Sequence, residues 1–321
     1  MSMSRRQVLA GVSAMGAPGL LRAQSAYPSK PIEIVVPATP GGGADIGARK
    51  AGELLFEALG QPVIVKNIAG AGGAIAASYV ARAEKTGYVI GMASDSTVLI
   101  NPLVVPEITY KLEDFQLLTT LYTGGFALAV GKDFPANTVK EFVDEVRRRG
   151  DLSCAMFGVV SSPRLITEMF MADTGINLVS VPYKGENEAV RDVIAGIVPA
   201  FFGTTANLLA QHKAGTLKIL GISTLERVKT ALPDVPTFKE LGLNNTVYRW
   251  FHGLMVPAGT PKDVVEKLSS TLAKIVMSDR FRAGIAMDLT PTVMTPAAFT
   301  DMAIATRERV QGIIKSRNLK V

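Results

Sequence analysis

Residues 32–49 are IEIVVPATPGGGADIGAR, and the expected fold class follows from this segment. Its first five residues, Ile32–Val36, form a β-branched run with one charge, which predicts a buried strand. Pro37 ends the strand because proline cannot donate a ladder hydrogen bond. Pro40 and the three glycines after it mark a loop. Apolar residues then recur at helical spacing, and we expect Asp45 to cap this helix.

A strand, a glycine loop and a helix N-terminus in succession form a site suited to an anion. The glycines allow positive φ and leave no Cβ between a ligand and the backbone. The first helical turn offers free N–H groups, and the helix dipole adds partial positive charge. A tight turn without a ligand is the alternative, and neither the Walker A pattern nor G-x-G-x-x-G is present. The candidate binding residues here are Pro40, Gly42, Gly43, Ala44 and Asp45.

The N-terminus predicts export. Ser4-Arg5-Arg6-Gln7-Val8-Leu9 and the apolar stretch after it indicate a signal peptide over residues 1–25. It is either of the twin-arginine type or a Sec signal that carries two arginines, and both place the protein in the periplasm. The formal net charge of +6 includes three arginines of this segment, so +3 remains without them. No dense basic stripe of the kind that binds nucleic acid is left.

Reactive side chains are scarce in the 321 residues. Cys154 is the single cysteine and lies in a strand-like stretch, so we expect a buried structural thiol. The two histidines, His212 and His252, leave no plausible His-based metal site and lie near no nucleophilic serine in sequence. The G-x-S-x-G elbow of hydrolases is also absent. We therefore expect a protein that is not an enzyme and that carries no cofactor and no metal.

Strand-like and helix-like stretches alternate along the chain, which predicts an α/β fold with mainly parallel sheets. The length is sufficient for two domains of ordinary size. Phe126–Val130 is expected to cross into a second domain, and Tyr248–Val256 to cross back. We therefore assign residues 26–124 and 249–321 to domain 1, and residues 125–248 to domain 2.

Polar and small residues follow several predicted strands. Ligands of open α/β sheets lie beyond the carboxyl ends of the strands, so these loops extend the candidate site. Local turns and caps are the alternative role for the hydroxyl groups, and we expect Ser162 to cap the helix that follows it. The further candidate residues are Gly70, Ser94, Asp95, Ser161, Ser162, Arg164, Tyr183, Gly203, Thr204 and Thr205.

A series of short motifs covers nearly the whole mature chain in order. It includes VPATPGGGAD at 36–45, ALGQPV at 58–63, VPYKG at 181–185, LPDVPT at 232–237 and VPAGTP at 256–261. Together these motifs resemble the Bug, or TctC-like, extracytoplasmic solute receptors. The resemblance implies a two-domain, periplasmic-binding-protein-like (type II) flytrap, with a mixed, mainly parallel sheet in each domain and crossing hinge strands. It also implies a small carboxylate ligand held by backbone N–H groups and ordered water.

The chain departs from the family pattern in its second half. Arg164 stands where the family has a histidine, and Val159 and Val160 make the preceding loop apolar. Gly203 stands where the family often has an acid. The loss of an acid and the gain of a guanidinium group would favour an anionic ligand, and Arg164 is a candidate to bind a second carboxylate bidentately. Exposure of Arg164 to solvent is the alternative.

The resulting hypothesis is a monomeric periplasmic receptor. It captures a small carboxylate and delivers it to the membrane permease subunits of a tripartite tricarboxylate transporter. One alternative is a binding protein that feeds a membrane sensor kinase, which needs the same pocket. Another is an exported hydrolase, which the lack of a catalytic set disfavours.

Overall fold

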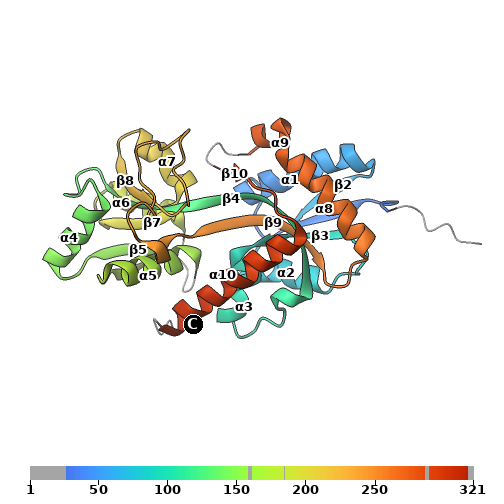
Figure 1. Cartoon of the computed structure of the whole chain (residues 1–321), viewed down its shortest axis with the longest axis horizontal. Helices are drawn as coiled ribbons and strands as arrows, with labels where there is room; N and C mark the ends of the chain where they lie inside the picture. The colour runs from blue at the N-terminus through green and yellow to red at the C-terminus, as the bar shows by residue number, and fades with distance from the viewer. Residues whose placement is uncertain (1–26, 158–160, 184, 286–288, 317–321) are drawn as a thin grey trace, which may run out of the picture.

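The computed structural model describes residues 27–157, 161–183, 185–285 and 289–316. The predicted signal peptide at 1–25, Val159, Val160 and residue 184 of the VPYKG motif lie outside these ranges. Figure 1 shows two α/β lobes side by side along the long axis of the molecule. One continuous sheet passes through both, in the order β2-β1-β3-β9-β4-β7-β5-β6. In the described ranges, no helix is both long enough and apolar enough to span a membrane.

The first lobe is a sheet covered on both faces. Its parallel strands are β1 (Ile32–Val36), β2 (Val63–Asn67) and β3 (Val89–Ser94), with β1 in the centre. One face packs against α1 (Gly43–Leu59), α8 (Lys262–Met277) and α9 (Asp279–Ala283). The other face packs against α2 (Ala74–Ala81), which follows the short helix η1 (Ala71–Gly73). Because both faces are covered, β1 is apolar at every position except Glu33.

The second lobe repeats this plan. Its parallel strands are β5 (Ser153–Phe157), β6 (Val179–Tyr183) and β7 (Ala200–Thr204), and β8 (Leu217–Ile222) pairs with β4. Side chains of α4 (Val139–Arg149) and α5 (Ser162–Thr174) form the core on one face. Side chains of α6 (Glu186–Ile194) and α7 (Thr205–Lys213) contribute to the core on the other.

Two long strands and one helix connect the lobes (Figure 1). The strand β4 (Phe115–Gly131) pairs with β9 (Arg249–Pro257) along its first part and with β7 and β8 along its second. The predicted crossing strand at 126–130 is therefore only the end of a longer element. The helix α10 (Pro296–Ser316) places Phe299 in the core of the first lobe and Val310 in that of the second. The remaining short elements are η2 (Ser96–Ile100), α3 (Asn101–Val104), η3 (Leu112–Asp114), η4 (Asn244–Thr246) and β10 (Thr290–Pro291).

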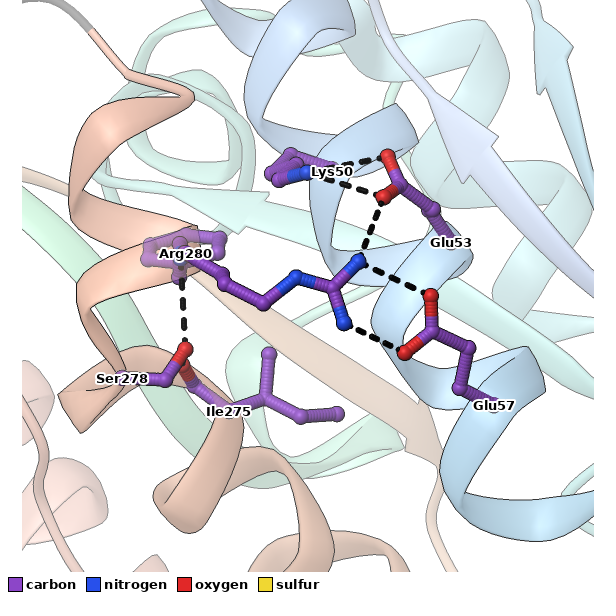
Figure 2. A network of polar contacts seen from close by, with 7 residues as sticks. Lys50, Glu53, Glu57, Ile275, Ser278 and Arg280 are labelled. Atoms are coloured by element: carbon purple, nitrogen blue, oxygen red, sulfur yellow. Dashed lines mark hydrogen bonds and ion pairs between the residues drawn. The ribbon is translucent and has the colours of Figure 1, made fainter.

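Ion pairs hold α9 onto α1 at the outer surface of the first lobe (Figure 2). The guanidinium group of Arg280 donates to both oxygens of Glu57, at 2.6 and 2.9 Å, and to Glu53 at 3.2 Å. Lys50 donates to the same Glu53 carboxylate at 2.9 Å. The side chains of Arg280, Glu53 and Glu57 are about half exposed to solvent, so water screens these pairs and they add little to stability. The lobe is held mainly by its two apolar cores.

Gly124 of β4 is paired with Trp250 of β9. A Cβ built on Gly124 would lie 2.2 Å from the indole ring of Trp250. Gly124→Ala should therefore displace the ring and lower the free energy of unfolding by about 1.5 kcal/mol. Urea unfolding measures this loss. Gly43→Ala is the control because a Cβ there meets no atom within 4 Å. Equal stability of the two variants would contradict the prediction.

Candidate functional site

A cavity of about 750 Å³ lies between the two lobes. The N-terminus of α1 forms one wall, and the N-terminal ends of α6 and α7 contribute the opposite wall. The crossing strands β4 and β9 contribute aromatic side chains between these walls. Its lining residues are Gly43, Ala44, Tyr122, Gly185, Glu186, Asn187, Glu188, Thr204, Ala206, Asn207, Trp250, His252 and Leu289.

The wall on the first lobe consists of backbone. Gly42 is the N-cap of α1 with extended dihedral angles (φ −78°, ψ 166°), and it has no side chain that could cap the helix. Gly43 and Ala44 follow in the first turn and line the cavity. N–H groups of a first helical turn have no acceptor within the helix. The helix dipole places partial positive charge at the same point, so this wall suits a carboxylate.

Asp45 anchors this wall, and the prediction that it caps α1 is wrong. The cap is Gly42, because α1 already begins at Gly43. The Asp45 carboxylate accepts hydrogen bonds at 2.9 Å from the Gly41 N–H, from Arg49 and from Asn67. The bond from Arg49 is the main reason that the pKa of Asp45 is lowered to about 2. Asp45 therefore fastens the glycine loop to β2, at whose end Asn67 lies.

The crossing strands contribute a hydrogen-bonded aromatic pair to the cavity. The Tyr122 hydroxyl donates to the Gly43 carbonyl at 2.9 Å. Its oxygen lies 3.1 Å from Nδ1 of His252, so the imidazole is the donor in that contact. Burial lowers the pKa of His252 to about 4, which keeps the ring neutral at pH 7. Trp250 packs against both rings, with centroid distances of 6.2 Å to Tyr122 and 5.2 Å to His252.

The wall on the second lobe carries an acid that the sequence analysis did not single out. Glu186, the first residue of α6, accepts hydrogen bonds from the backbone N–H of Thr204 and, at 3.0 Å, from its hydroxyl. Burial outweighs these bonds and raises the pKa of Glu186 to about 7. A Cβ on Gly203 would lie 2.8 Å from this carboxylate. An acid from another segment therefore lies beside Gly203. Its place directly after the VPYKG motif was the signal in the sequence that could have identified it.

Asp95 lies at a buried contact between the lobes and is only 4% exposed. Its carboxylate accepts hydrogen bonds from the hydroxyl groups of Ser162 at 2.7 Å and Tyr248 at 2.9 Å. Burial raises the pKa of Asp95 despite these bonds. The expected cap of α5 at Ser162 is wrong, because Ser161 is the N-cap and its hydroxyl accepts from the Arg164 N–H. This leaves the Ser162 hydroxyl to donate to the opposite lobe.

Three other candidate residues of the second lobe form hydrogen bonds with neighbouring side chains or backbone. Arg164 donates to Glu168 at 2.6 Å, and its side chain is 24% exposed. The Tyr183 hydroxyl donates to Asp192 at 2.9 Å. Thr205 donates to the Gly125 carbonyl and lines a second cavity of about 480 Å³.

The candidate residues in the loops of the first lobe have hydrogen bonds mainly to residues close to them in sequence. Gly70 has a φ of 125° and is the N-cap of η1. The Ser94 hydroxyl lies 3.1 Å from that of Thr97, and it accepts from the Thr97 N–H at 3.2 Å. Pro40 belongs to the loop that Asp45 fastens through Gly41. Of the predicted residues, Gly43, Ala44 and Thr204 are those that line the 750 Å³ cavity.

Two α/β lobes, strands that cross between them and a cleft at the N-terminal ends of helices define a type II periplasmic-binding-protein-like fold. The model of the TctC family, described as the tripartite tricarboxylate transporter family receptor, matches residues 47–319, so the chain belongs to this family. BugT of Bordetella pertussis is 30% identical over 299 residues, which cover 92% of this chain and 91% of BugT.

Solved structures agree with this assignment. A structure described as a periplasmic transporter is 34% identical, with a TM-score of 0.79 over 92% of this chain and 99% of its own. MatC of Rhodopseudomonas palustris with bound malate is 25% identical, with a TM-score of 0.75 over 90% of this chain and 100% of its own. R. palustris Rpa4515 with adipate is 27% identical, with a TM-score of 0.78 over 92% and 99%. The family is one of solute receptors.

Proposed function

We propose that this protein is a periplasmic receptor that captures a small carboxylate in the cleft between its lobes. The observation that carries the proposal is the first turn of α1, whose backbone at Gly43 and Ala44 faces a cavity with a polar wall opposite. Main-chain N–H groups at a helix N-terminus bind a carboxylate without a buried counter-charge. Ordered water completes the contacts between protein and ligand, so the same loops accept ligands with different side groups. The malate and adipate complexes of the related proteins support this ligand class.

Closure of the cleft requires a hinge, which we place at the predicted domain boundaries 124/125 and 248/249. Gly124 and Gly125 of β4 pair with Trp250 and Arg249 of β9, so the two boundaries lie opposite each other. A ligand that contacts both lobes stabilises the closed arrangement. We expect the receptor to act as a monomer and to hand the ligand to the membrane permease of a tripartite tricarboxylate transporter.

We infer that the protein binds its ligand without converting it. The His212 ring accepts the Ile219 N–H at 3.2 Å, and His252 is bonded to Tyr122. Burial raises the pKa of the Cys154 thiol to about 12, so it is a poor nucleophile. The contacts of both histidines and the cysteine are therefore those of structural residues rather than of catalytic ones.

Isothermal titration of the mature protein tests the proposal. The panel contains mono- and dicarboxylates, aliphatic and aromatic, and we expect at least one ligand to bind with a Kd of roughly 1 μM or tighter. Recovery of the ligand unchanged after incubation distinguishes a receptor from an enzyme. Turnover of a panel member, or binding of none, would contradict the proposal. Deletion of the gene should abolish uptake of the bound carboxylate if the protein serves a permease.

A further inference from the structure

Glu186 occupies a position in the second lobe that would otherwise suit an anionic ligand. Thr204 is the last residue of β7 and the N-cap of α7, so its N–H lies where a helix dipole favours negative charge. The Glu186 carboxylate accepts this N–H and the Thr204 hydroxyl. Gly203 leaves the room for it, since a Cβ there would lie 2.8 Å from the Glu186 oxygen. The protein's own carboxylate thus fills the anion position of this lobe.

The cavity is consequently polarised. Its first-lobe wall presents the backbone of Gly43 and Ala44 at the positive end of α1. Its second-lobe wall presents the carboxyl groups of Glu186 and Glu188. A ligand with two carboxylates would meet favourable charge at one wall and repulsion at the other. A ligand with one carboxylate and a hydrogen-bond donor at its far end would be complementary to both walls.

The other titratable groups among the described residues that line the cavity do not cancel this polarity. His252 of β9 is neutral because burial lowers its pKa to about 4. Burial raises the pKa of Tyr122 of β4, so its hydroxyl is also neutral. Asn187 and Asn207 contribute amide groups, which are bonded to each other at 2.9 Å. Glu186 and Glu188 are the acids among the described residues that line this cavity.

We propose that Glu186 makes the cleft select carboxylates that carry a hydroxyl or ammonium group at the opposite end, in preference to dicarboxylates. The inference rests on the proposed function and specifies its ligand. The Glu186 oxygens accept a hydrogen bond from such a donor while they remain bonded to Thr204. A second ligand carboxylate offers no proton and brings a like charge instead.

Titration calorimetry with matched ligands tests the inference. The probes are butanedioate, 4-hydroxybutanoate and 4-aminobutanoate, with the corresponding six-carbon series, at pH 8. We expect a donor-bearing probe to bind wild type at least about 10-fold more tightly than the dicarboxylate of equal length. Glu186→Gln keeps an acceptor for Thr204 but removes the charge, and should reduce this preference below about 3-fold. Asp234→Asn removes an exposed charge of the same lobe that does not line the cavity, and should keep the preference.

A second readout uses pH. Lowering the pH from 8 to 6 protonates Glu186, whose pKa is near 7, so the preference of wild type should narrow. Glu186→Gln should show no such change, which separates this effect from titration of the ligands themselves. Wild-type binding of dicarboxylates at least as tight as that of donor-bearing probes at pH 8 would overturn the inference and leave the proposed function intact. Binding of no carboxylate at all would overturn the proposed function itself.

Discussion

Gly43→Pro should weaken binding of the carboxylate ligand by about 10- to 100-fold and leave the fold intact. Proline removes one N–H donor, and a hydrogen bond to a charged group contributes about 1.5–3 kcal/mol. The position tolerates proline because Gly43 is the first residue of α1 and the preceding Gly42 is extended, with a ψ of 166°. Isothermal titration with the tightest ligand of the panel measures the loss.

Gly43→Ala is the matched control for this variant. It adds a Cβ in open space and keeps the N–H, so its affinity should stay within about 3-fold of wild type. Thermal unfolding of both variants should remain close to that of wild type. Undiminished binding by Gly43→Pro would show that the first turn of α1 does not hold the ligand, and would refute the central point of the proposed function.

Asp95→Ala should lower the free energy of unfolding by about 3 kcal/mol. The substitution leaves the hydroxyl groups of Ser162 and Tyr248 without their shared acceptor at a buried contact between the lobes. Tyr248→Phe removes one donor and retains the carboxylate, so it should cost about 1 kcal/mol. Urea unfolding monitored by the fluorescence of Trp250 compares these variants. A loss below about 0.5 kcal/mol for Asp95→Ala would contradict this role.

The same substitution should change the pH dependence of stability. Burial raises the pKa of Asp95 above the usual value of 3.8, so the folded protein binds this proton more tightly than the unfolded chain does. The contribution of this group is therefore fully present below pH 3.8 and is lost as the pH rises through the raised pKa. The stability difference between wild type and Asp95→Ala should widen as the pH is lowered through the raised pKa of Asp95 towards 3.8. A difference that stays constant as the pH is lowered from 7 to about 4 would contradict a raised pKa for this carboxyl group.

Much of the fold could be predicted because it follows local patterns. The apolar run at Ile32–Val36, the glycine loop and the helix after it all appear in the structure, in the expected order. The predicted boundaries of an element were less accurate where one strand changes its pairing partners along its length. β4 continues from Phe115 to Gly131 because it pairs first with β9 and then with β7 and β8, and local sequence carries no signal for that change of partner.

The cleft was predicted less completely than the fold. Gly43 and Ala44 were identified because a glycine loop before a helix is a local signal. Glu186 was not, because a glutamate in a first helical turn is common on surfaces and only its contact with Thr204 reveals its place in the cavity. Arg164 was a candidate to bind a second carboxylate, with exposure to solvent as the alternative, and in the structure its guanidinium group is bonded to Glu168 on the next turn of α5.

The sequence by itself determined the alternation of strands and helices, the glycine-rich helix N-terminus and the family motifs, since each depends on residues close together in the chain. Only the tertiary structure decided which polar groups meet at the contact between the lobes and within the second-lobe wall of the cleft. Asp95 meets Ser162 and Tyr248, and Glu186 meets Thr204, through contacts between residues far apart in sequence. Burial at those contacts sets the charge of each acid, and burial is a property of the packed lobes rather than of any local segment.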